Sequence, residues 1–346
     1  MIHLLGGGGD TPFVKPNVSY CVQENEVHYN PRTWADEYLT VRILEDGNLG
    51  FQFVNGLSLD YSFNGGITWD GTLTNDNNTI LVTNGQEISF KKGNITSNDN
   101  SASDRLKMSM PTNYGNFFTN CQFEVFGNVM SIIDSENFAN ANVIHEDLGN
   151  LFEDCTKLVN AENLILPATT LASGCYSGMF YRCTSLTSAP ELPVTTLANY
   201  CYSGMFFGCT SLTSAPELPV TTLAEGCYKS MFYGCTSLTS APELPATILA
   251  NDCYNYMFYG CTNLVNAPEL PATTLASSCY NNMFYGCSSL NYIKAMFTTT
   301  PEIDYTDDWV SGVASSGTFV KNSKATWNVT GVDGVPTGWT VQYVTV

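Results

Sequence analysis

The chain has 346 residues, of which 44% are hydrophobic and 13% are charged. This length is enough for more than one compact domain, and the hydrophobic share argues against wholesale disorder. The 13 Lys and Arg residues and 32 Asp and Glu residues give a formal net charge of −19, which argues against nucleic acid or an anionic membrane surface as a partner. No apolar run approaches the ~18 residues of a membrane span.

Residues 1–16 begin with an apolar segment from Met1 to Leu5, which four glycines follow. The segment has no basic region and is too short for the apolar part of a secretory signal, so no signal peptide is visible. We expect a short N-terminal anchor joined to the rest of the chain by a glycine linker. The apolar residues from Met1 to Leu5 would then contact another subunit.

Residues 17–125 have the pattern of a β-rich domain. Segments 38–44 and 86–90 alternate between apolar and polar residues, as half-buried strands do. Segments 59–63 and 67–69 flank Asn64-Gly65-Gly66, which is a hairpin signal. We therefore predict a small β-sandwich-like domain here.

Residues 126–300 are dominated by a repeat of 26 residues. Met, Phe, Leu and Cys all recur at this interval, and the cysteines form two columns that are eight residues apart: Cys175, Cys201, Cys227, Cys253 and Cys279, and then Cys183, Cys209, Cys235, Cys261 and Cys287. Such a period indicates a solenoid, in which each unit buries its apolar face against its neighbours. We place a degenerate first unit at about 143–170 and five regular units at 171–300.

One unit shows how the solenoid would be built. The apolar residues of segment 198–209 lie at offsets 0, 3, 4, 7, 8 and 11, the pattern of one α-helix face. Segments 210–215 and 219–223 are strand-like; Pro216 and Pro219 interrupt the first, and the second begins at Pro219. Because helices stack 8–10 Å apart and strands ~4.8 Å apart, the array should curve with its strands on the concave face. The predicted class is α+β: a β-sandwich-like domain, a curved β/α solenoid and a small β-rich cap.

Residues 301–346 form the predicted C-terminal cap. Segments 308–313, 317–320 and 338–341 are strand-like, and Trp309, Trp327 and Trp339 are interpreted as the core of the cap rather than as a ligand cage. The acidic residues between Glu302 and Asp308 are interpreted as a solvated loop. Calcium binding is the alternative for this loop, although its spacing is not that of an EF-hand.

The repeated unit resembles the BspA-like leucine-rich repeat of surface proteins from gut Bacteroidetes and their bacteriophages. Segment 205–214, Met-Phe-Phe-Gly-Cys-Thr-Ser-Leu-Thr-Ser, and Leu218-Pro219 after it carry the resemblance. It covers about residues 143–300 and is met in register in five units. The resemblance implies a leucine-rich-repeat solenoid that serves surface attachment and recognition.

The cysteine columns allow three interpretations: metal ligands, disulfides or small buried apolar side chains. Two cysteines eight residues apart on one helix would be ~12 Å apart along its axis, too far to share an ion or to form a disulfide. Bridges between neighbouring units stay possible, but helix spacing disfavours them. We therefore interpret both columns as structural and buried, and expect no metal and no other cofactor.

Two further columns are candidate binding surfaces. A carboxylate column near the predicted concave face would attract a cationic ligand, a basic protein patch or a divalent ion, or would simply be solvated; it comprises Glu191, Glu217, Glu243 and Glu269. An aromatic column would stack on sugars, adhere to a partner or pack between helices; it comprises Tyr181, Phe207, Tyr233, Tyr259 and Tyr285.

The chain contains no phosphate-binding glycine loop, no nucleophile paired with a histidine and no zinc motif. We therefore predict a non-enzymatic binding and adhesion protein. The favoured setting is the virion surface of a gut bacteriophage, with contact to other virion subunits through Met1 to Leu5. The alternatives are a bacterial cell-surface adhesin and an enzyme with a site in the N-terminal β-domain. The expected partner is a host-surface glycan or protein, and an oligomer is possible.

Overall fold

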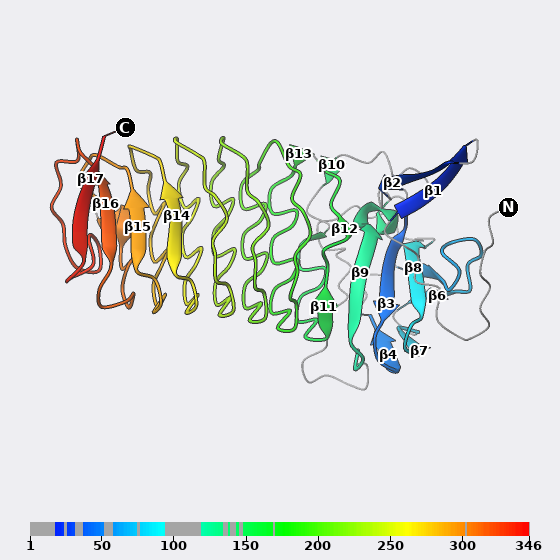
Figure 1. Ribbon diagram of the computed structural model, residues 1–346. Coiled ribbons are helices and arrows are strands. Elements are labelled where there is room, and N and C mark those ends of the chain that lie inside the picture. Colours follow the sequence, from blue (N-terminus) through cyan, green and yellow to red (C-terminus); the bar gives the residue numbers. More distant parts are fainter. Residues whose placement is uncertain are drawn as a thin grey trace.

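The computed structural model describes residues 18–23, 26–31, 37–51, 58–74, 77–93, 119–133, 138, 143–144, 148–168, 170–301 and 303–345. The regular secondary structure of the described chain is mostly strands, in several sheets (Figure 1). Helix is scarce there: α1 (Ile303–Thr306) and the 3₁₀ helix η2 (Val129–Ile132) have four residues each, and Phe138 and Leu148 are single described 3₁₀ residues. The predicted α+β class therefore fits poorly. The N-terminal segment from Met1 to Leu5 lies outside the described residues. No helix of the described part has the length and apolar character of a membrane span.

The N-terminal region is built around one sheet with the strand order β11-β9-β3-β8-β5-β6. Its antiparallel strands are β3 (Leu39–Ile43), β5 (Leu59–Ser62), β6 (Gly71–Leu73), β8 (Glu87–Lys92) and β9 (Phe123–Asn128). Two smaller sheets pair β1 (Val18–Gln23) with β2 (Glu26–Pro31) and β4 (Gly47–Gly50) with β7 (Thr79–Val82). The strands predicted at 38–44, 59–63 and 86–90 are confirmed.

The hairpin predicted around Asn64 is longer than expected. The partner of β5 is β6, which begins at Gly71, and residues 67–69 lie in the connecting loop rather than in a strand. Side-chain hydrogen bonds hold this loop: Asn64 Oδ1 accepts from the Thr68 amide at 2.9 Å, and Ser62 Oγ accepts from the Gly66 amide at 2.9 Å. These bonds replace the strand pairing that residues 67–69 would have made.

Strand β9 joins the N-terminal sheet to the repeats. On one side it pairs antiparallel with β3, and on the other it pairs parallel with β11 (Leu158–Asn160) and β12 (Leu164–Ile165) of the first unit. The sheet therefore runs without a break from the N-terminal region into the repeats (Figure 1). The domain boundary predicted at residues 125–126 falls inside β9.

The α-helix predicted over residues 198–209 is wrong, and so are its equivalents in the other units. Each segment is a row of tight turns, in which every fourth residue has a left-handed backbone: Tyr200, Gly204 and Gly208 have φ of 55°, 62° and 71°. A left-handed residue every four positions ends any helical run. An apolar pattern with a period of four looks like the helical period of 3.6 over so short a segment.

The turns are stabilised by two alternating sets of hydrogen bonds. Within a unit, the amide of Met205 donates to the carbonyl of Tyr202 at 3.2 Å, three residues back. Between units, the amide of Tyr202 donates to Cys227 at 3.0 Å, and the amide of Phe206 donates to Met231 at 3.0 Å. Because amides on the turn side bond directly to the next unit, the wide spacing of stacked helices is absent. The physical reason for the predicted curvature is therefore also absent.

The opposite side of the array carries strands near its two ends, and on that side only isolated bridges join the described units between Leu171 and Asn266. Strand β10 (Val143–Ile144) pairs with β13 (Thr170–Leu171), and β14 (Asn266–Leu270), β15 (Tyr292–Ala295), β16 (Thr318–Asn322) and β17 (Thr340–Val344) form a parallel sheet. Segment 210–215, predicted to be a strand, is irregular. Proline lacks the amide that a ladder needs. Where Lys294 stands in place of the repeated proline, the pairing of β15 with β16 is regular.

The described residues from Pro301 to Thr345 form the C-terminal end of the array. Segment 308–313, predicted to be a strand, is a turn, whereas segments 317–320 and 338–341 correspond to β16 and β17. The indoles of Trp309, Trp327 and Trp339 are buried, and each donates a hydrogen bond to a backbone carbonyl, at 3.0, 3.0 and 2.7 Å. The three rings therefore belong to the interior of this region.

Candidate functional site

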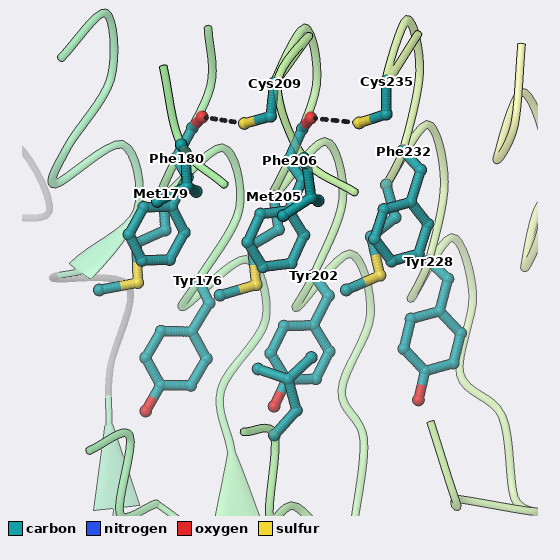
Figure 2. Packing of buried hydrophobic residues seen from close by; sticks show 14 of the residues in the cluster. Tyr176, Met179, Phe180, Tyr202, Met205, Phe206, Cys209, Tyr228, Phe232 and Cys235 are labelled. Atoms are coloured by element: carbon teal, nitrogen blue, oxygen red, sulfur yellow. Dashed lines mark hydrogen bonds between the residues drawn. The ribbon is translucent and has the colours of Figure 1, made fainter. Parts of the chain in front are cut away.

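The interior of the array consists of side-chain columns that run from unit to unit. The rings of Phe152, Phe180, Phe206, Phe232, Phe258 and Phe284 stack with centroid distances of 5.3–5.8 Å. A tyrosine column from Tyr176 to Tyr280 stacks beside it at 5.7–6.1 Å (Figure 2). A methionine column lies next to the phenylalanines, and its members have no exposed surface. The columns fill the space between the turn side and the strand side.

Both cysteine columns are buried in this interior. All ten of their members have 0% exposed surface and carry free thiols. In the second column, each thiol donates a hydrogen bond to a phenylalanine carbonyl of the preceding unit: Cys209 bonds to Phe180 at 3.1 Å, and Cys235 bonds to Phe206 at 3.1 Å (Figure 2). Cys183, Cys261 and Cys287 make the equivalent bonds at 3.0–3.1 Å. These thiols link neighbouring units.

Burial suppresses the reactivity of these thiols. Desolvation raises the pKa of Cys201 to about 11, and it raises the pKa values of Cys175, Cys227, Cys279 and Cys287 to about 12. The thiolate is the form that attacks electrophiles and binds metals. At neutral pH the columns therefore present protonated thiols, which suits packing rather than chemistry.

The tyrosine column also has raised pKa values. Desolvation is the first cause at Tyr202, and the neighbouring ionisable groups Tyr176 and Cys201 add to it. The hydroxyl oxygens of Tyr176 and Tyr202 are buried and have no hydrogen-bond partner in the described structure. Buried tyrosines usually have a partner, so these two hydroxyls reduce stability relative to phenylalanine.

The four glutamates of the candidate carboxylate column lie on the strand side and are all exposed. We call Glu191, Glu217, Glu243 and Glu269 the carboxylate strip. Glu269 in β14 forms an ion pair with Lys294 in β15, with 2.7 Å between the carboxylate and ammonium atoms. The other three have no ion pair among the described residues. The strip therefore offers three unpaired carboxylates and one that already holds a lysine.

The candidate aromatic column lies on the turn side. We call Tyr181, Phe207, Tyr233, Tyr259 and Tyr285 the outer aromatic ladder; its rings are half-buried and stack nearly parallel at 4.3–4.6 Å. The guanidinium of Arg182 lies 5.1 Å from the centre of the Tyr181 ring. Because the ring faces contact one another, the ladder exposes ring edges. A sugar platform needs an exposed face, so this geometry does not favour stacking on sugars.

Four of the described acidic residues near the C-terminal end, Asp304, Asp307, Asp308 and Asp333, interact electrostatically. No group of three or more His, Cys, Asp or Glu side chains in the described chain is arranged to hold a metal ion. Desolvation raises the pKa of Asp307, with further contributions from Asp308, Asp333 and Asp304. Asp308 and Asp333 are also linked, because the Asp308 amide donates to Asp333 Oδ1 at 2.8 Å.

The sequence did not point to Lys321, which lies in β16 with 2% of its surface exposed. Its ammonium nitrogen lies 3.8 Å from the centre of the Trp327 ring and 5.9 Å from that of Tyr343, and it donates to the Trp327 carbonyl. Burial lowers the pKa of this amine. A lysine in an otherwise apolar column carries no recognisable sequence signal, because its partners are set by the pairing of β16 with β17.

Comparisons with known proteins give no relative. No protein-family model, no curated protein and no solved structure matches the chain.

Proposed function

We propose that this is a non-enzymatic recognition protein, in which the repeats form a leucine-rich-repeat solenoid that serves as a rigid scaffold for a binding surface. The observation that carries the proposal is the separation of side chains between interior and surface. The thiols are buried, and burial raises their pKa values, whereas the strand side presents one exposed carboxylate in each of four units. This arrangement suits contact with a partner rather than covalent chemistry.

The rigidity of the array supports the same function. Amide hydrogen bonds, thiol hydrogen bonds and stacked rings all connect each unit to the next. A surface held at fixed spacing loses little conformational freedom when a partner binds, and this preserves affinity. The carboxylate strip is such a surface, because each glutamate occupies the same position in its unit.

The chemistry of the strip favours a basic protein patch as its partner. The chain has a net charge of −19, so its field attracts cationic surfaces. The ion pair between Glu269 and Lys294 shows how an ammonium group sits on the strip. Lysine or arginine side chains of a partner would take the same position at Glu191, Glu217 and Glu243. A neutral glycan would gain less from these carboxylates.

The resemblance of the repeats to BspA-like proteins supports surface display. A virion surface component of a gut bacteriophage is the setting we favour, and a bacterial cell-surface adhesin is the alternative. Neighbouring genes separate the two: capsid and portal genes support the first, and genes for glycan utilisation at the outer membrane support the second.

The experiment compares the intact protein with two variants of equal charge. In the first, Glu191, Glu217, Glu243 and Glu269 are all replaced by glutamine. In the control, Glu45, Glu162 and Glu225 are replaced by glutamine and Asp304 by asparagine, which removes four exposed acids elsewhere. Labelled protein is bound to gut Bacteroidetes cells and the bound fraction is measured.

We expect the strip variant to lose most of its binding and the control to keep it. Equal binding by the strip variant and the wild-type protein would contradict a role for the strip. Equal loss in both variants would show that overall charge, rather than the strip, attracts the cells.

A further inference from the structure

The last rung of the array leaves part of its interior exposed. The register of the parallel sheet places Ile293, Phe319 and Val341 in one column, with 0%, 0% and 37% of their surfaces exposed. A second column contains Ala295, Lys321 and Tyr343, with 0%, 2% and 61% exposed. Val341 and Tyr343 thus occupy interior positions, but no further rung of the described chain covers them.

The turn side of the same end is covered. The Val310 amide donates to the Val332 carbonyl at 3.1 Å, and Trp309 Nε1 donates to the Gly334 carbonyl at 3.0 Å. Thr306 Oγ1 donates to the Asp333 carbonyl at 2.9 Å. The loop that contains these three acceptors therefore closes the turn side and leaves the strand side open.

The open side ends in an unpaired strand edge. The amide of Thr340 donates to the carbonyl of Gly317, and the carbonyl of Val344 accepts from the amide of Ser323. Both bonds point towards β16. In a parallel pair, alternate residues bond to the same neighbour. Thr340, Gln342 and Val344 therefore bond towards β16, whereas the amides and carbonyls of Val341 and Tyr343 point outwards.

The charge of the strands at this end differs from that of the whole chain. Strands β16 and β17 contain Lys321 as their one charged side chain, in a chain of −19, whereas Asp304, Asp307, Asp308 and Asp333 lie in the turns and loop of this end. Strand β17 contains neither a charged residue nor a proline, which are the residues that usually keep an exposed edge strand from pairing with another chain. A second copy would meet strong repulsion at acidic surfaces but not here.

We propose that β17 is the interface of a symmetric dimer, in which it pairs antiparallel with β17 of a second copy about a two-fold axis at Gln342. Val341 then forms a hydrogen-bonded pair with Tyr343 of the partner subunit, and Tyr343 forms the equivalent pair with Val341 of the partner subunit. The outward amides and carbonyls of both residues are satisfied. The exposed valine and tyrosine become a cross-strand pair of the aromatic and β-branched kind, which stabilises sheets.

The first test is the molar mass of the intact chain in solution over a wide range of concentration. We expect a dimer for the wild-type protein and a dissociation constant raised at least about tenfold in Val341→Lys and Tyr343→Lys, since an edge charge opposes strand pairing. Val341→Pro removes one outward amide and should act in the same way. Ile248→Lys is the control, because Ile248 is 80% exposed and lies far from this edge.

The second test is a cross-link at the axis. Gln342 would face Gln342 of the partner subunit in a non-hydrogen-bonded pair, where the Cα separation of ~4.5 Å suits a disulfide. Under mild oxidation, Gln342→Cys should give a covalent dimer and Thr337→Cys should not. A wild-type monomer at all concentrations, or a dimer that neither edge variant weakens and Gln342→Cys does not cross-link, would overturn the proposal. Circular dichroism confirms that each variant is folded.

Discussion

The thiol of Cys209 donates a hydrogen bond to the carbonyl oxygen of Phe180, 3.1 Å away and 29 positions earlier in the chain. The same carbonyl accepts from the Cys183 amide within its own unit, also at 3.1 Å. One oxygen therefore receives a bond from within its unit and another from the next unit. This relationship recurs along the array and explains why a cysteine, a small side chain that can also donate, suits this position.

Replacing Cys209 with alanine should reduce the free energy of unfolding by about 1–2 kcal/mol, because it removes buried volume and the bond between units. Cys201→Ala is the matched control, since Cys201 is equally buried but makes no such bond to the preceding unit. We expect the loss at Cys209 to exceed that at Cys201 by about 0.5–1 kcal/mol in denaturant titrations. An equal loss at both positions would show that the thiol hydrogen bond of Cys209 does not contribute to stability.

The protein should unfold at alkaline pH. Burial raises the pKa of Cys201 from 9.0 to about 11, and those of Cys175, Cys227, Cys279 and Cys287 to about 12. The unfolded thiols lose protons above pH 9, whereas the folded thiols keep them. The stability that the buried thiols contribute is therefore fully present below pH 9, and it is lost as the pH rises towards these folded-state pKa values.

The size of this effect is comparable to the total stability of a domain. Each thiol lowers the free energy of unfolding by about 1.4 kcal/mol per pH unit above pH 9. The five thiols together therefore lower it by about 7 kcal/mol at pH 10. Folded domains are stable by about 5–15 kcal/mol. Circular dichroism under reducing conditions should show unfolding between pH 9 and pH 11, the range set by the Cys201 thiol. Native spectra that persist at pH 11 would contradict the burial of the thiols.

Substitutions at Ser230 distinguish turns from helices by the sign of the stability change. Ser230 has a left-handed φ of 55°, and glycine occupies the equivalent positions Gly178 and Gly204. Ser230→Gly should raise the free energy of unfolding by up to about 1 kcal/mol, since glycine has no penalty there. Ser230→Ala should not stabilise the protein. If this segment were a helix, alanine would be favoured over glycine, and Ser230→Gly would have the lower thermal midpoint of the two variants.

The carboxylate strip should show opposite behaviour at its middle and its end. Glu217→Gln relieves repulsion from Glu191 and Glu243 and should raise stability by no more than about 0.5 kcal/mol at low salt. Glu269→Gln also loses the ion pair with Lys294 and should give no such gain. The difference in thermal midpoint between each variant and the wild-type protein should be smaller at ~1 M salt than at low salt, because salt screens exposed charges. Identical shifts for both variants at low salt would contradict this account.

The sequence predicted the spacing of the array and its repeated side chains, because a constant interval is visible without structural knowledge. It also predicted the strands that became β3, β5 and β8, where alternation is clear. It did not predict the turns. Periods of 4 and 3.6 differ by only about one residue over three turns, so the apolar pattern fits both. Gly204 and Gly208, four residues apart, were a signal against a helix.

The candidate surfaces were likewise predicted only in part from the sequence. The sequence identified Glu191, Glu217, Glu243 and Glu269 as a column, but the ion pair of Glu269 with Lys294 depends on the register of β14 against β15. It also left open how the outer aromatic ladder packs. The stacking of ring faces there follows from the close spacing of turns. The exposed column ends at Val341 and Tyr343 depend on the pairing of distant segments and carry no local signal.

The most direct test of the account is a count of reactive thiols, with each labelled cysteine identified by mass spectrometry. The account requires both cysteine columns to lie in the interior as free thiols, without a disulfide or a bound ion. In the native protein at neutral pH, we predict that the twelve buried free cysteines resist labelling, and that all twelve react after denaturation without a reductant. Rapid labelling of the repeat cysteines in the native protein, or thiols missing after denaturation because of disulfides or a bound metal, would contradict it.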